Sequence, residues 1–285
     1  MNQLRLPGPL VSSEWLSENL NHPKLIVLDA TIIKPAVAAN TNVAIDETNQ
    51  ISGTQFFDIE NRFSDLNCSL PHMMPTSEIF SKEVQVLGVC QDSVVVIYDR
   101  HGIFSSPRAW WMFKAMGHTQ VAVLDGGLPA WISLGLPVQR KAAMPVQQGN
   151  FSARPNKELF CNADLVNAAL QDDNWVVLDA RSEGRFYGRE PEPRAGLRPG
   201  HMPNSLSLPF TSLLNGFHLK DPESLRRIFA GKKIDHQNLI LTCGSGVSAC
   251  VLALAGELAG FSKLRVYDGS WSEWGLPSLR PVVES

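Results

Sequence analysis

The sequence has few of the features that mark a metal-binding, secreted or membrane-spanning protein. Its five cysteines form no CxxC pair and no histidine spacing is typical of a zinc site, so we expect no metal ion and no organic cofactor. The longest apolar stretch, near 249–256, is far below the ~20 residues that a membrane span needs. The N-terminus lacks the apolar core of a secretory signal. These absences predict a soluble protein.

An excess of basic charge is also missing. The chain has 25 Lys and Arg against 28 Asp and Glu, a formal net charge of −3, so nothing overall would hold a polyanion by counterion release. General binding to nucleic acid or to a membrane surface is therefore disfavoured. Because the cysteine count is odd, at least one thiol stays unpaired within the monomer, and we expect a reducing compartment, the cytoplasm.

What the sequence does contain is an internal repeat. Its 285 residues are enough for two domains, and three segments of the first half recur in the second at offsets of 150, 144 and 143 residues. The matching pairs are Leu25–Ala30 with Trp175–Ala180, Val94–Asp99 with Leu239–Cys243, and Val123–Trp131 with Val266–Trp274. Nearly constant offsets indicate two copies of one domain.

Each copy alternates short Val/Ile/Leu runs with longer amphipathic stretches. Continuous apolar runs without a period of two are typical of strands buried on both faces of a parallel sheet. We therefore predict an α/β fold, with two tandem domains that each hold a parallel sheet flanked by helices. The polar, Pro- and Gly-containing segment 144–160 is the predicted linker between a first domain at 1–143 and a second at 161–285.

The copies differ most sharply after their central strand. In the second copy the strand delivers Cys243 into Gly-Ser-Gly-Val-Ser, and a helix begins near Ala249, whereas the first copy has Asp99 at the matching position. A short glycine-containing loop between a strand and a helix turns backbone N–H groups inward, and these donors with the helix dipole stabilise an anion. We therefore expect Cys243 to be a reactive thiolate at neutral pH and the first copy to be catalytically silent.

Two other interpretations of Cys243 fit the sequence less well. A buried structural cysteine would need no glycines or hydroxyls beside it, and that description suits Cys250, on the following helix, better. A cysteine-dependent phosphatase needs an Arg six positions after its cysteine to clamp the phosphate, and position 249 is Ala. Cys68, Cys90 and Cys161 have no comparable context.

With these motifs the chain resembles the tandem rhodanese-domain sulfurtransferases. The resemblance spans the two copies, with Asp179-Ala-Arg181, Gly200-His-Met-Pro-Asn204 and Tyr267-Asp-Gly-Ser-Trp271 among its motifs. Within that superfamily a Cys-Gly-Ser-Gly-Val-Thr loop is typical of 3-mercaptopyruvate sulfurtransferases, and a Cys-Arg-Lys-Gly-Val-Thr loop of thiosulfate sulfurtransferases. The loop here follows the first pattern, with Ser248 in place of Thr.

The resemblance implies a catalytic group as well as an activity. Cys243 is the nucleophile that takes the sulfane sulfur, Ser245 is the loop serine, and His72 in Pro-His-Met-Met-Pro is the partner histidine. The family's acid maps to Glu60 in Asp-Ile-Glu, but this chain is one residue longer between the acid and the histidine, so Asp65 remains an alternative. Such a relay would handle the thiol proton of the substrate.

Substrate binding is also implied by the resemblance. Arg185 in Gly-Arg-Phe and Arg194 in Pro-Glu-Pro-Arg match the family's two binding arginines, and a guanidinium supplies the planar fork that a 2-oxo carboxylate needs. The loop residues assigned to binding are Gly244, Gly246, Val247 and Ser248. We expect Arg108 and His201 to be structural or at the domain interface, and the Asp-Gly turns at 125 and 268 to serve backbone conformation alone.

The activity expected from the resemblance is a 3-mercaptopyruvate sulfurtransferase that releases pyruvate and passes a Cys243 persulfide to a thiol such as thioredoxin, or to cyanide. Two alternatives remain open. One is a thiosulfate:cyanide sulfurtransferase, and the other is a non-enzymatic persulfide carrier or scaffold. The physiological acceptor and the oligomeric state cannot be read from one chain.

Overall fold

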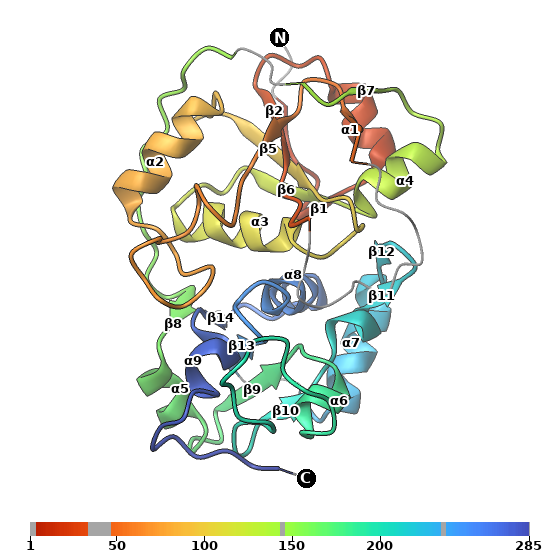
Figure 1. Cartoon of the computed structure of the whole chain (residues 1–285). Helices are drawn as coiled ribbons and strands as arrows, with labels where there is room; N and C mark the ends of the chain where they lie inside the picture. The colour runs from red at the N-terminus through yellow and green to blue at the C-terminus, as the bar shows by residue number, and fades with distance from the viewer. Residues whose placement is uncertain (1–3, 34–46, 143–145, 235–237, 285) are drawn as a thin grey trace.

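Two lobes, each built on a five-stranded parallel sheet, are stacked on one another (Figure 1). This computed structural model describes residues 4–33, 47–142, 146–234 and 238–284. The strand orders are β1-β6-β5-β2-β4 and β8-β14-β13-β9-β10, so the two sheets have the same topology. The α/β fold with a parallel sheet in each copy is confirmed.

The strands fall where the repeat places them. The first sheet holds β1 (Leu10–Val11), β2 (Leu25–Asp29), β4 (Gln55–Phe56), β5 (Val94–Tyr98) and β6 (Val121–Leu124). The second holds β8 (Phe160–Cys161), β9 (Trp175–Asp179), β10 (Leu206–Ser207), β13 (Asn238–Thr242) and β14 (Leu264–Tyr267). Two small antiparallel pairs join β3 (Asn49–Ile51) to β7 (Val138–Arg140) and β11 (Leu214–Asn215) to β12 (His218–Leu219).

Helices cover both sheets, and several begin at a side-chain cap. In the first lobe they are α1 (Ser13–Asn19), α2 (Ser77–Val86), α3 (Ser106–Ala115) and α4 (Gly127–Ser133). In the second they are α5 (Ala163–Ala169), α6 (Glu183–Phe186), α7 (Pro222–Gly231), α8 (Ala249–Ala259) and α9 (Ser270–Trp274), with a 3₁₀ turn at Phe210–Leu213. Thr76, Asn162 and Asp221 each accept a hydrogen bond from an N–H of the first turn, which satisfies a donor that the helix itself leaves unpaired.

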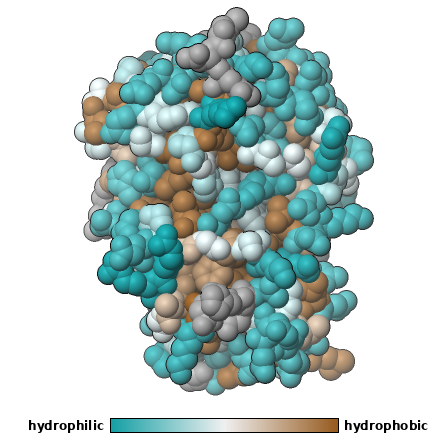
Figure 2. All heavy atoms as spheres, turned by 180° about the vertical axis from the view of Figure 1, so that it is seen from behind, coloured by the Kyte–Doolittle hydropathy of each residue, from teal (hydrophilic) through white to brown (hydrophobic). Residues whose placement is uncertain are grey.

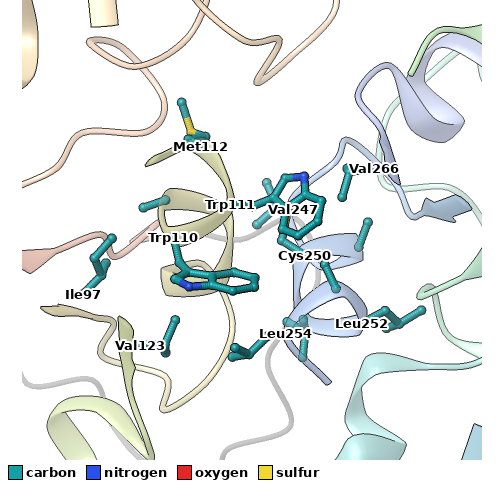
Figure 3. Close-up of a cluster of buried hydrophobic side chains, with 14 of the residues drawn as sticks. Ile97, Trp110, Trp111, Met112, Val123, Val247, Cys250, Leu252, Leu254 and Val266 are labelled. Atoms are coloured by element: carbon teal, nitrogen blue, oxygen red, sulfur yellow. The ribbon is translucent and has the colours of Figure 1, made fainter. Parts of the chain in front are cut away.

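The lobes meet along α3 and α8, which lie side by side between the two sheets (Figure 1). Trp110 and Trp111 of α3 lie among Val247, Cys250 and Leu254 from the region of α8 (Figure 3), and one cluster of buried side chains runs through both lobes. Seen from behind, the surface is mostly hydrophilic, with hydrophobic atoms in small patches (Figure 2). Among the described residues, no helix is long and apolar enough to cross a membrane.

The predicted linker lies against the first lobe. Between 146 and 156 the chain has no helix or strand, but Gly149, Phe151 and Arg154 donate backbone hydrogen bonds to Gln85, Val89 and Met116. Phe151 is fully buried beside Phe80 and Phe113. Residues 143–145 lie outside the described part, and the boundaries of 144–160 stay a prediction.

Candidate active site

Cys243 follows β13 directly and opens a tight loop, 243–248, that ends where α8 begins. The hydroxyl of Ser270 accepts hydrogen bonds from the N–H of Cys243 (3.2 Å) and of Gly246 (3.1 Å), so one side chain links both positions of the loop. Gly246 has φ +74°, a left-handed conformation that favours glycine, and a Cβ there would lie 2.9 Å from the Asp268 carbonyl oxygen. The loop residues Cys243, Gly244, Ser245, Val247 and Ser248 all line one pocket.

The matching loop of the first lobe shows what such a turn can hold. The Asp99 carboxylate, fully buried, accepts hydrogen bonds from four backbone N–H groups at 2.9–3.0 Å and from the Ser106 hydroxyl at 2.7 Å. The four N–H groups belong to residues 101, 104, 105 and 106. In the first copy the loop therefore binds its own anion, which supports the expectation that the Cys243 loop, built the same way, stabilises an anion at its centre.

His72 reaches this pocket from the other lobe. Its Nδ1 is hydrogen bonded to the Oγ of Ser245 at 3.0 Å, across 173 residues of sequence. Burial, together with the positive charges of Arg108 and Arg194, lowers the pKa of His72 to about 4. The imidazole is therefore neutral at pH 7, and in the tautomer protonated at Nε2 it accepts the serine hydroxyl through Nδ1.

Arg185 and Arg194 form the cationic side of the pocket. Nη2 of Arg194 donates to Ser245 Oγ at 3.4 Å, and Nη2 of Arg185 lies 3.1 Å from the position that a Cβ on Gly244 would take. Glu192, whose side chain is 2% exposed, accepts from both Arg185 (2.5 Å) and Arg181 (2.7 Å) and so holds the Arg185 guanidinium in place. Burial lowers the pKa of Arg194, but an arginine remains charged at neutral pH.

The pocket encloses about 110 Å³ between the two lobes. Three apolar side chains line it that sequence reasoning missed, namely Ile32 and Phe104 from the first lobe and Phe210 from the second. Only Phe104 carried a signal, because it falls in the segment that follows Asp99. The apolar wall shields the Cys243 thiol, which is 2% exposed, from water.

The acid partner of His72 is not identified by a contact. Glu60 is exposed and lines the pocket with His72, whereas the Asp65 carboxylate accepts the N–H of Asn67 at 3.0 Å within its own turn. Among the described residues, no hydrogen bond joins His72 to either carboxylate. Glu60 as the acid, with Asp65 as the alternative, stays a prediction.

Other residues singled out in the sequence, such as Cys250 and His201, do not line the pocket. Cys250 is buried on α8, where burial raises the pKa of its thiol to about 12. His201 stacks on Phe186 at a ring-centroid distance of 4.0 Å and is hydrogen bonded to its carbonyl. Within 4–33, 47–142, 146–234 and 238–284, no group of three or more His, Cys, Asp or Glu is arranged to hold a metal ion.

Comparison with known proteins places this geometry in a family. The model of the rhodanese-like domain matches the chain twice, over residues 12–134 and 162–276. The chain belongs to the rhodanese-domain family. Its tandem arrangement and its resemblance to the rhodanese-domain sulfurtransferases are confirmed.

Individual relatives cover nearly all of this rhodanese-domain chain. Human "3-mercaptopyruvate sulfurtransferase" is 40% identical over 273 residues, 93% of this chain and 91% of that protein. Rat "thiosulfate sulfurtransferase" is 41% identical over 277 residues, with the same coverage of each chain. The crystal structure of the 3-mercaptopyruvate sulfurtransferase SseA from Escherichia coli matches with a TM-score of 0.81 at 36% identity and covers 93% of this chain and 99% of that one. Overall identity therefore does not separate the two donors, and the site must.

Proposed function

We propose that this protein is a 3-mercaptopyruvate sulfurtransferase that carries sulfur as a persulfide on Cys243. The observation that carries the proposal is one pocket in which the Cys243 loop, two arginines and a neutral Ser245–His72 pair face each other. The relatives named for this activity support it.

The arrangement suits a small 2-oxo carboxylate with a terminal thiol. The guanidinium groups of Arg185 and Arg194 supply the fork for the carboxylate, since they lie beside Gly244 and Ser245 at the base of the pocket. The Cys243 thiolate attacks the substrate sulfur, so an S–S bond forms and the C–S bond breaks. The electron pair of that bond stays on carbon as the enolate of pyruvate.

The proton of the substrate thiol must then reach that carbon. Ser245 and His72 offer a path, because the neutral imidazole can accept a proton through the serine hydroxyl and return it to the enolate. An acceptor thiol next attacks the outer sulfur and leaves with it, which restores the Cys243 thiolate. We propose thioredoxin-type thiols, or cyanide, as acceptors.

Donor choice follows from the charge of the loop. Gly244 and Ser245 add no cation, so the cations that line the pocket are Arg181, Arg185 and Arg194. Glu192 forms ion pairs with Arg181 and Arg185 and offsets part of their charge. That suits a monocarboxylate better than a dianion such as thiosulfate. The thiosulfate activity remains the second candidate because a relative of that name is equally similar.

A steady-state comparison of the two donors tests the proposal. With thioredoxin or cyanide as acceptor, we expect kcat/KM for 3-mercaptopyruvate to exceed that for thiosulfate at least tenfold, measured by pyruvate release and by thiocyanate. Cys243→Ser should abolish turnover, and Cys90→Ser, a thiol outside the pocket, should not change it. Preference for thiosulfate would establish the second candidate, and a Cys243 persulfide without multiple turnover would establish a carrier.

We further propose the cytoplasm as the location. All five cysteines are free thiols in the structure, which favours a reducing compartment. Cell fractionation with an antibody against the chain measures this directly, and recovery in an organelle fraction would contradict it.

A further inference from the structure

A buried ion pair joins the two lobes directly behind the pocket. Arg108, on α3, has its Nη2 2.8 Å from Oδ1 of Asp268, in the turn between β14 and α9, and the two side chains are 0% and 9% exposed. Because desolvation offsets much of the attraction between buried charges, such a pair is weak evidence for stability alone. Its remaining contacts indicate a different role.

Each partner of the pair binds the backbone of the His72 loop, Arg108 at His72 itself and Asp268 two residues further on. Arg108 Nη2 donates to the His72 carbonyl at 2.5 Å, and Asp268 Oδ2 accepts the N–H of Met74 at 2.7 Å. His72 has φ +61°, in the left-handed region that residues with a Cβ rarely adopt. These two hydrogen bonds fix an otherwise unfavourable conformation, and that conformation directs the imidazole at Ser245.

The same guanidinium also contacts the loop that carries the nucleophile. Nη1 of Arg108 donates to the Gly246 carbonyl at 3.4 Å, and the guanidinium carbon lies 4.9 Å above the ring of Phe160. One side chain of the first lobe therefore touches both the His72 loop and the Cys243 loop. The sequence predicted only a structural or interface role for Arg108 and a turn at Asp268. It did not predict these contacts.

The second junction between the lobes offers an internal comparison. It repeats the acidic contact, because Asp125, the counterpart of Asp268, accepts the N–H of Leu219 at 2.9 Å. Leu219 lies two residues before the N-cap of α7, as Met74 lies two residues before the N-cap of α2. The aspartate contact is therefore common to both junctions of the scaffold.

The two junctions differ at the positions that correspond to His72 and Arg108. The counterpart of His72 is Phe217, since each lies four residues before the N-cap of the next helix, α2 or α7. An offset of 143 or 144 places Val251 or Leu252 at the position of Arg108. The arginine thus occurs only at the junction that holds the nucleophile and the histidine. A purely architectural role would give no reason for that asymmetry.

We propose that Arg108, paired with Asp268, is a positioning residue that holds His72 and the Cys243 loop in register for sulfur transfer. The activity readout of this inference rests on the function proposed above, but the state of His72 can be measured without it. The charged groups near His72 are Arg108 with its partner Asp268, Arg194, and the carboxylates Glu60 and Asp65. Loss of the Arg108 charge should raise the pKa of His72 from about 4 toward its ordinary value of 6.5.

Two substitutions separate charge from geometry, with a third as the matched control. Arg108→Met removes the charge and keeps the length of the side chain, whereas Arg108→Lys keeps the charge and loses the fork that contacts three acceptors. Lys114 is on α3, like Arg108, and its ion pair with Glu257 of α8 crosses the same interface. Lys114→Met breaks that pair without a contact to His72.

We expect both Arg108 variants to release pyruvate with kcat at least tenfold below Lys114→Met, because positioned acid–base catalysis is worth about 10²–10⁴-fold. KM should change less than threefold, since Arg185 and Arg194 are untouched. By NMR titration of the histidine ring, the pKa of His72 should rise in Arg108→Met and stay low in Arg108→Lys.

Three outcomes would overturn the proposal. They are kcat within threefold of the control in a folded Arg108→Met, an unchanged His72 titration in that variant, and loss of folding in both Arg108 variants, which would assign a structural role. If the unmodified protein does not turn over 3-mercaptopyruvate, the proposed function fails, whereas the His72 titration still decides whether the pair holds the histidine.

Discussion

At the scale of single residues, Gly244 affects both the choice of sulfur donor and the space available to Arg185. A Cβ at Gly244 would lie 3.1 Å from Nη2 of Arg185, so any larger side chain must displace the guanidinium that we assign to the substrate carboxylate. Glycine here thus leaves room for an arginine from a neighbouring segment. The sequence indicated a neutral loop, but only the structure shows that the Arg185 guanidinium lies where a side chain at Gly244 would extend.

We predict that Gly244→Arg with Ser245→Lys moves the preference toward thiosulfate. Two added cations favour a dianion, while displacement of Arg185 and loss of the Ser245–His72 hydrogen bond weaken the 3-mercaptopyruvate reaction. The ratio of kcat/KM for thiosulfate to that for 3-mercaptopyruvate should rise at least tenfold. Gly244→Ala, which adds crowding without charge, is the control. An unchanged ratio in the double variant would mean that the loop does not set donor choice.

At the scale of elements, the two strand–loop–helix units have the same arrangement and differ in the side chain that opens each loop. The loop after β5 is filled by the Asp99 carboxylate, and the loop after β13 begins with Cys243. The first unit is therefore stabilised by an anion of its own and has no reason to bind another. For this reason we expect the first copy to be catalytically silent although it keeps the loop.

Asp99→Ala should destabilise the fold strongly for the same reason. The substitution leaves four backbone N–H groups buried without an acceptor, and we expect the free energy of unfolding to fall by at least about 3 kcal/mol. Asp99→Asn keeps one oxygen acceptor and should cost less. Urea denaturation followed by circular dichroism measures both, and equal stability of Asp99→Ala and the unmodified protein would show that the carboxylate is not needed there.

Much of this element structure is predictable from the sequence, since the offsets of 150, 144 and 143 located the central strands and the Cys243 loop. The site beyond that loop is only partly predictable. His72 required the family resemblance, because its contact with Ser245 depends on how the lobes dock. Asp268 was missed because an Asp-Gly sequence is typical of a turn, whatever its carboxylate contacts. Within the predicted linker at 144–160, the burial of Phe151 against Phe80 and Phe113 was not predictable, because the polar composition of the segment gives no sign of it.

At the scale of the whole molecule, the two lobes share one large cluster of buried side chains. Trp110 and Trp111 of α3 pack against residues of α8 (Figure 3). Separation of the two lobes would expose these side chains to water. The pocket is formed between the lobes, so its geometry depends on the same contacts. We therefore expect the lobes to unfold together, and the pH dependence of that transition reports on groups from both.

Stability should rise with pH between about 5 and 6.5. Burial is the main cause that lowers the pKa values of His72, His118 and His201, so between the folded and the unfolded pKa the unfolded chain binds more protons. The loss of folding free energy caused by these histidines is absent above pH 6.5. It grows as the pH falls toward about 4, the pKa of His72 in the folded protein. Each histidine can contribute a slope of up to about 1.4 kcal/mol per pH unit.

Urea unfolding at pH 5.0, 5.5, 6.0 and 6.5 measures this slope, with the window kept above the range where most carboxylates titrate. His118→Gln removes one titrating group and should lower the slope whatever it does to stability at pH 7. A flat free energy of unfolding across the window would contradict the prediction, because it would require the buried imidazoles to take up protons as readily in the folded protein as in water.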